Sequence, residues 1–265
     1  MAPPYDLYAI RYATREARRP EHFIGGDPHD APMPMDYFVW VAVGGDGRAV
    51  VIDTGFDEAM SIKRRRIFLR CPVESLRLVG VDPEAVEDVV LTHLHYDHVG
   101  NFAKFPKARF HLQEPELTYA TGRYMQYPGM SHPYEVEDVC GVVRLNYAGR
   151  VQFHGGDAEL APGIGLHFAG GHSAGLQFVT VETRRGRVVI ASDVSHYYEN
   201  LDAGRPFPIA FNVGMMHEAY DKVRSLAPRS HIVPGHDPKV MALYPAPSPE
   251  LAGQVVRLDV DPTGA

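Results

Sequence analysis

Residues 91–101, LTHLHYDHVGN, constrain this chain more than any other stretch. They overlap an apolar run, 89–91, that predicts a buried strand, and they end on Gly100-Asn101, which predicts a turn. Between the two lie four polar side chains within six residues: His93, His95, Asp97 and His98. Buried polar groups need partners, and imidazole nitrogens and carboxylate oxygens are the donors that zinc, iron, manganese and cobalt accept. The stretch therefore predicts a metal site in a loop at the end of a strand.

Three further candidate donors stand at the ends of later apolar runs. His172 follows two glycines, Asp193 ends the run 189–193, and His236 follows Pro234-Gly235. A glycine beside a ligand lets the backbone bend close to a metal without a side-chain clash. Each of the three is a weak signal alone. With the first four they make seven nitrogen and oxygen donors, which is enough for two metals that each keep an open position.

Three other features have two interpretations each. Asp53, at the end of an earlier predicted strand, is either a turn residue or an acceptor that orients a metal-bound histidine. His132 is either an ordinary surface residue or part of a pocket wall, because the loop 121–134 around it is rich in aromatic residues. The arginine runs 64–66 and 184–185 could mark a binding surface, but we interpret them as solvated faces.

Composition disfavours several classes of protein. The 265 residues carry 26 Lys and Arg against 33 Asp and Glu, a net charge of −7, which disfavours nucleic-acid binding through a basic surface. The two cysteines lack a C-x-x-C spacing and indicate neither a thiolate metal site nor a disulfide framework. No apolar stretch approaches the roughly 18 residues of a membrane span, and the N-terminus lacks a signal-peptide pattern. We therefore expect no membrane partner and a cytoplasmic location.

The apolar runs predict an α/β protein rich in strands. Strands are expected at 5–12, 37–43, 49–53, 89–91, 109–113, 151–154, 164–169, 176–183, 187–191, 231–233 and 255–259. Helices are expected at 57–70, 72–79, 114–120 and 213–227, and another is expected to start at Asp82-Pro83. The segments 13–36 and 121–134 are expected to be long loops. Such batches of strands and helices fit a sandwich with the sheets inside and the helices outside.

The order of the polar motifs resembles that of the metallo-β-lactamase fold superfamily. The residues that carry the resemblance are the H-x-H-x-D-H motif at 93–98, the isolated Gly171-His172-Ser173, the strand-end Asp193 and Gly235-His236. The match runs from about residue 53 to residue 236. It implies a four-layer αβ/βα sandwich, with two mixed β-sheets flanked by helices, in a single domain of residues 1–265. The metals are then expected at one edge of the two sheets.

Carried over residue by residue, the resemblance implies two divalent metal ions. One is expected to bind His93, His95 and His172, the other to bind Asp97, His98 and His236, and Asp193 to bridge them. Zinc is the favoured metal, with iron, manganese and cobalt as alternatives. A water or hydroxide between the ions, with its pKa lowered towards neutrality, is expected to attack a carbonyl or phosphoryl centre. Asp97 and Asp193 are therefore expected to be catalytic as well as metal-binding.

Within the superfamily, the segments 171–177, 192–198 and 235–237 resemble the quorum-quenching N-acyl homoserine lactone lactonases. This resemblance implies a hydrolase that opens an N-acyl homoserine lactone or a related small lactone or ester, and a homodimer is the expected assembly. Those lactonases carry a substrate-facing Tyr three residues after the bridging Asp, whereas this chain has His196 there, followed by Tyr197 and Tyr198. His196 either donates a hydrogen bond to the substrate or shuttles a proton, or it is an ordinary surface or turn residue. The two tyrosines are further candidate contacts.

Other interpretations remain open. A thioester hydrolase of the hydroxyacylglutathione hydrolase type, or another small ester or phosphodiester hydrolase, would use the same metal centre. The thioester hydrolases are expected to hold glutathione carboxylates with basic residues, and the sequence reveals no such cluster. A non-catalytic binding protein of the same fold is the remaining alternative, although such proteins usually lose ligands and none is missing here.

Overall fold

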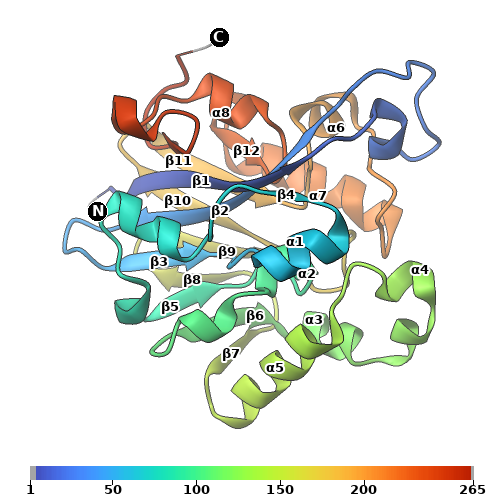
Figure 1. Ribbon diagram of the computed structural model, residues 1–265, viewed down its shortest axis with the longest axis horizontal. Helices are drawn as coiled ribbons and strands as arrows, with labels where there is room; N and C mark the ends of the chain where they lie inside the picture. Colours follow the sequence, from blue (N-terminus) through green and yellow to red (C-terminus); the bar gives the residue numbers. More distant parts are fainter. Residues whose placement is uncertain (1–3, 264–265) are drawn as a thin grey trace.

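The computed structural model describes residues 4–263 and contains two stacked β-sheets with helices on their outer faces (Figure 1). The larger sheet has eight strands: β1 (Asp6–Arg15), β2 (Met35–Val43), β3 (Ala49–Ile52), β4 (Ile67–Phe68), β5 (Asp88–Val90), β6 (Arg109–Gln113), β7 (Val151–His154) and β13 (Val255–Arg257). The smaller sheet has five strands: β8 (Ala158–Ala161), β9 (Ile164–Phe168), β10 (Gln177–Thr183), β11 (Gly186–Ser192) and β12 (Ile232–Pro234).

Both sheets are mixed. The larger sheet has the order β13-β1-β2-β3-β5-β6-β7, antiparallel from β13 to β3 and parallel from β3 to β7, with β4 also paired to β1. The smaller sheet has the order β12-β11-β10-β9-β8, in which only β12 pairs parallel. Successive residues of a strand point to opposite faces, so β1 contributes side chains to two hydrophobic cores. Leu7 and Ala9 pack between the sheets, while Ile10 and Tyr12 pack on the outer face.

Eight α-helices are present among residues 4–263: α1 (Glu58–Arg64), α2 (Tyr96–Val99), α3 (Glu114–Ala120), α4 (Pro128–Ser131), α5 (Val136–Tyr147), α6 (Tyr198–Ala203), α7 (Val213–Leu226) and α8 (Lys239–Leu243). Short 3-10 helices lie at Arg19–His22, Glu74–Val79, Pro83–Ala85, Phe102–Lys104, Arg123–Gln126, Arg229–His231 and Pro249–Leu251. Helix α5 packs Val142 and Leu145 into the outer core of the larger sheet, and α7 packs Tyr220 and Val223 against the smaller sheet. The predicted four-layer αβ/βα sandwich is confirmed. None of the described helices is both long and apolar enough to span a membrane.

Several predicted elements are wrong in extent or kind. The helix expected at 57–70 ends at Arg64, because Arg65 takes a left-handed conformation (φ 55°) and the chain then pairs with β1 as β4. The helices expected at 72–79 and after Asp82 are 3-10 turns, although Asp82 does cap the second by accepting the Glu84 N–H. The first strand runs on to Arg15, so the loop expected at 13–36 begins later.

Other elements have no counterpart among the sequence predictions. Helix α5 carries valines and a glycine, which are poor helix formers, and strand β8 is made of alanine, glutamate and leucine, which favour helix. The short helices α2, α4, α6 and α8 have four to six residues each and lack a full period of apolar positions. Tertiary packing therefore determines the secondary structure of these segments more than local propensity does.

Candidate metal centre

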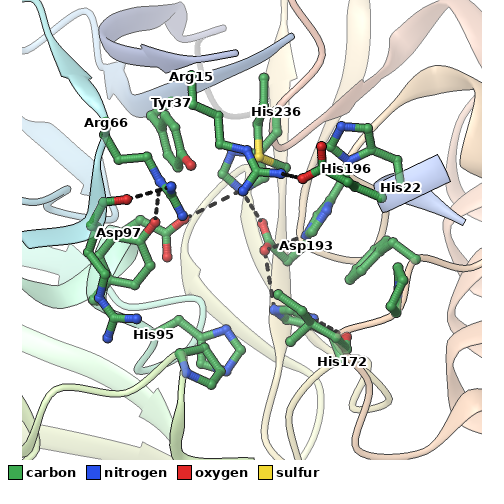
Figure 2. Close-up of a pocket in the computed structure, with 18 of the residues that line it drawn as sticks. Arg15, His22, Tyr37, Arg66, His95, Asp97, His172, Asp193, His196 and His236 are labelled. Carbon is green, nitrogen blue, oxygen red and sulfur yellow. Dashed lines mark hydrogen bonds and ion pairs between the residues drawn. The ribbon is translucent and has the colours of Figure 1, made fainter. Parts of the chain in front are cut away.

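The seven predicted metal ligands lie in one cluster beyond the ends of strands β5, β9, β11 and β12. Figure 2 shows His95, Asp97, His172, Asp193 and His236 of this cluster. The H-x-H-x-D-H motif follows β5 of the larger sheet, and the other three ligands each follow a strand of the smaller sheet. Six of the seven form two groups whose donor atoms lie within 4.8 Å of one another: His93, His95 and His172 in one, and Asp97, His98 and His236 in the other. These are the two sets that the resemblance implies.

Asp193 lies between the two sets (Figure 2). Its Oδ2 is 3.2 Å from Nε2 of His172 in the first set. Its Oδ1 is 3.1 Å from Nε2 of His236 and 3.4 Å from Nε2 of His98 in the second set. The carboxylate thus turns one oxygen to each set, which is the arrangement that a bridging ligand requires.

The histidines are oriented by acceptors on their far side. Nδ1 of His98 lies 2.7 Å from Oδ2 of Asp53, and Nδ1 of His236 lies 2.9 Å from the Asp36 carbonyl. The Ile209 carbonyl and the Thr92 hydroxyl contact Nδ1 of the histidines at 172 and 93 in the same way. Such contacts fix the ring and the tautomer, and they leave Nε2 free to face the metal position. Of its two interpretations, Asp53 therefore fits the orienting acceptor.

The donor atoms are arranged to bind metal ions and are poorly arranged to hydrogen-bond with one another. Nε2 of His98 and Oδ1 of Asp193 are buried without a hydrogen-bond partner among residues 4–263. Nε2 of His93 faces Nε2 of His172 at 3.2 Å. Burial, with a smaller contribution from neighbouring histidines, holds the pKa of His93 and His95 well below the usual range. Both rings are therefore neutral and can offer a lone pair, so the donor set suits two divalent ions.

The backbone around Asp193 is shaped to bring this carboxylate into place. Ser192, the residue before it, has φ 45°, a conformation that side chains other than glycine rarely adopt. Gly235 passes so close that an added Cβ would lie 2.8 Å from Oδ1 of Asp193. The glycine beside His236 therefore allows the close approach that the sequence suggested.

Glu116 of α3 is a buried carboxylate that joins the two ligand loops. Its Oε1 accepts hydrogen bonds from the Leu94 N–H and the Tyr134 hydroxyl, both at 3.0 Å. Its Oε2 accepts one from the Gly175 N–H at 2.9 Å. Leu94 lies inside the H-x-H-x-D-H motif and Gly175 lies just after His172, so Glu116 ties a loop of one sheet to a loop of the other. Nothing in the sequence distinguishes it from other glutamates near helix starts.

A cavity of about 150 Å³ opens onto the ligands (Figure 2). Its walls come from the end of β1 and the segment after it, from Arg64 and Arg66, from His132 and from residues 207–209. His132 therefore belongs to the pocket wall. His22, which has no predicted role, also lines the cavity, and its Nε2 lies 3.1 Å from the Tyr197 hydroxyl. The path of the loop after β1 places His22 beside the cavity. The sequence of this loop has no apolar periodicity from which that path could be predicted.

His196 lines the cavity, but its Nε2 is already used. Burial lowers the pKa of His196 to about 3, so the ring is neutral, and Nε2–H donates to Oδ2 of Asp193 at 2.9 Å. The ring also stacks on Phe207, with the centroids 3.4 Å apart. His196 therefore fits a residue that positions Asp193 better than one that donates to a substrate through Nε2.

The two tyrosines predicted as further substrate contacts do not line the cavity. The Tyr197 hydroxyl is turned to His22 and to the Met33 and Pro34 carbonyls. Tyr198 is buried in the core between the sheets, and Arg229 covers its ring. The geometry does not support a direct contact of either tyrosine with a substrate in this cavity.

The interpretation of residues 64–66 as a solvated face is wrong for two of the three arginines. Arg64 and Arg66 line the cavity and are only partly exposed, whereas Arg65 is exposed. The C-terminal end of α1 turns at Arg65, so its neighbours face inward. Arg15, at the end of β1, joins them in the wall. Arg15, Arg64 and Arg66 therefore form a basic cluster in the cavity wall. It is not visible in the sequence because it is assembled from two separate segments.

The model of the metallo-beta-lactamase superfamily matches residues 34–241, which is most of the chain and includes all seven predicted ligands. The chain belongs to the metallo-beta-lactamase superfamily. Among curated members it is 31% identical over 136 residues to an N-acyl homoserine lactonase from Bacillus thuringiensis. The aligned residues cover 51% of this chain and 49% of that protein. It is 31% identical over 160 residues to the N-acyl homoserine lactonase AiiB from Agrobacterium fabrum, which covers 57% and 55%. The chain thus spans about half the length of these superfamily members.

Solved structures of the superfamily share the fold over nearly the whole chain. A quorum-quenching N-acyl homoserine lactone lactonase superposes with a TM-score of 0.75 at 21% identity, covering 90% of this chain and 95% of that one. The dizinc quorum-quenching lactonase AidC superposes with a TM-score of 0.69 at 15% identity, covering 90% and 89%. At these identities the likeness establishes the common fold alone.

Replacing Asp53 by asparagine is expected to lower zinc affinity by roughly 10- to 100-fold, because the orienting carboxylate of a metal-bound histidine contributes about that much. Asparagine tolerates the left-handed backbone of Asp53 (φ 62°), so the change removes the charge with little strain. Competition with a chromogenic chelator measures the affinity. Asp221→Asn, at a side chain that is 82% exposed, is the control. A change of less than threefold at Asp53 would contradict its orienting role.

Proposed function

We propose that this protein is a dinuclear-metal hydrolase that opens the ring of a small lactone. The observation that carries the proposal is Asp193, whose two oxygens face two separate sets of donors beside a cavity. The lactonase names of the superfamily members that it resembles support the choice of an ester bond. Zinc is the proposed metal, and elemental analysis of freshly purified protein tests that choice.

Two bound divalent ions would supply a Lewis acid for the substrate carbonyl and a water that is acidic near neutral pH. The chain's own residues would do the rest. The histidines and two aspartates of the two donor sets would hold the ions, and His196 fixes one oxygen of Asp193. Phe207, Pro208 and Ile209 cover one wall and limit the access of bulk water.

A second groove, of about 780 Å³, adjoins the cavity through Arg64 and His132, which line both. Much of its surface is apolar, from residues that include Met125, Val136 and Val139. We propose that the acyl part of the substrate lies there, while the lactone ring occupies the smaller cavity. The groove is open to solvent, so it suits chains of more than one length.

The proposal is tested with metal-loaded protein and a panel of lactones of increasing acyl length, beside a simple ester, a thioester and a phosphodiester. We expect kcat/KM for at least one lactone to exceed that for every other class by tenfold or more. A thioester or phosphodiester as the best substrate would contradict the lactonase proposal while keeping the metal centre. The homodimer also stays a proposal, which a light-scattering mass equal to the monomer would contradict.

A further inference from the structure

Arg66 stands in the wall of the cavity without an acidic partner. Its Nε–H donates to the Tyr96 hydroxyl at 3.0 Å, and Nη1 donates to the Arg64 carbonyl at 2.6 Å. A guanidinium has five N–H groups, so about three remain. Among residues 4–263 no carboxylate forms an ion pair with Arg66. Asp97 raises the pKa of Arg66 less than Tyr37 and Tyr96 do, and it belongs to the metal site.

The other two arginines of the cavity are already committed. Arg64 donates to Glu135 through Nε and Nη2, at 3.0 and 2.6 Å, and to the His132 carbonyl at 2.7 Å. Arg15 pairs with Glu21 at 3.0 Å. Glu135 and Glu21 are thereby paired with other arginines, and Asp97 and Asp193 belong to the metal site. Arg66 is the cation of this cavity that the described residues leave without a counter-charge.

Arg66 is also held in place. Its guanidinium carbon lies 5.9 Å from the ring centres of both Tyr37 and Tyr96. Figure 2 shows its head, like that of Arg15, directed toward the area around Asp97 and His236. A donor fixed in this way loses little freedom when a ligand binds, so its position is set for a group beside the second metal set.

We propose that Arg66 binds a carboxylate that the substrate carries in addition to the bond that is cleaved. A partly buried cation without a partner is costly, and an anionic ligand removes that cost. The planar guanidinium matches a carboxylate in shape and in hydrogen bonding. One uncommitted cation suits a single negative charge. The inference deepens the proposed function, because it selects anionic lactones or esters over neutral ones.

The test uses zinc-loaded protein and calorimetric titration with succinate, glutarate and adipate, each compared with its monoamide. One carboxylate of each probe can reach the metals, and only the diacid offers a second one to Arg66. We expect at least one diacid to bind more than tenfold tighter than its monoamide. That ratio should fall below threefold in Arg66→Gln. Arg65→Gln removes the same charge from the exposed neighbour and should leave the ratio unchanged.

Arg66→Lys separates binding from a purely structural role. Lysine keeps the charge but loses the fork that holds Tyr96, so a ratio above threefold in this variant supports charge recognition. A wild-type ratio of tenfold or less for all three diacids, or a ratio above threefold in Arg66→Gln, would overturn the inference. The titrations need no turnover. A protein that hydrolyses no lactone would overturn the proposed function and leave this test intact.

Discussion

Asp193→Ala is expected to lower kcat/KM for the best lactone by at least ~10³-fold, because a metal centre contributes several kcal/mol to stabilising charge in the transition state. Asp193 is the residue that faces both donor sets, so its loss affects both metal positions at once. We also expect the bound zinc to fall below two equivalents per chain. Steady-state kinetics and elemental analysis of the same preparation measure the two effects.

Asp221→Ala, at an exposed aspartate that does not line the cavity, is the matched control and should retain wild-type kinetics. Circular dichroism checks that both variants are folded. A fall of less than tenfold in Asp193→Ala, with two zinc ions still bound, would contradict the bridging role. A fall in activity with full zinc content would instead place Asp193 in proton transfer.

Glu116→Ala is expected to destabilise the protein by ~4 kcal/mol. The substitution leaves the Leu94 and Gly175 N–H groups and the Tyr134 hydroxyl without their acceptor, and a buried polar group left unpaired costs about 1–3 kcal/mol. For a chain of this size, that loss lowers the melting temperature by roughly 10 °C. We also expect weaker zinc binding, since Glu116 holds the two ligand loops together.

Glu114→Ala is the control, because Glu114 lies on the same helix, α3, with its side chain exposed. Thermal unfolding of the zinc-free proteins compares the two variants without a contribution from metal binding. A melting temperature of Glu116→Ala within 2 °C of Glu114→Ala would show that Glu116 does not hold the loops. Glu116→Gln should recover only part of the loss, because its amide donor would face a backbone N–H.

The cluster of seven candidate metal ligands could be predicted from the sequence because its signal is local. Four of them stand within six residues, and the others stand beside glycines or at strand ends. Backbone geometry explains the glycine beside His236. Gly235 leaves room for Asp193, and any larger residue would collide with the Asp193 carboxylate. The sandwich followed from the resemblance, and the alternating apolar residues of β1 show why it forms, since they supply a core on each face.

Apart from His132, which the sequence offered as part of a pocket wall, the cavity walls could not be predicted, because they depend on contacts between segments far apart in the sequence. Arg66 faces inward only because α1 ends at Arg65 in a left-handed turn, and that turn contains no glycine to indicate it. His22 reaches the cavity through a loop without periodicity. The geometry does not support the substrate contacts predicted for Tyr197 and Tyr198, because their places near Asp193 in the sequence do not determine the direction of each side chain.

Titration of the metal-free protein with zinc, while lactone hydrolysis is followed, tests the central claim most directly. We expect the rate to rise with added zinc and to reach its maximum at two equivalents per chain, one for each donor set. A rate that is already maximal at one equivalent, or that is independent of zinc, would contradict a dinuclear centre bridged by Asp193.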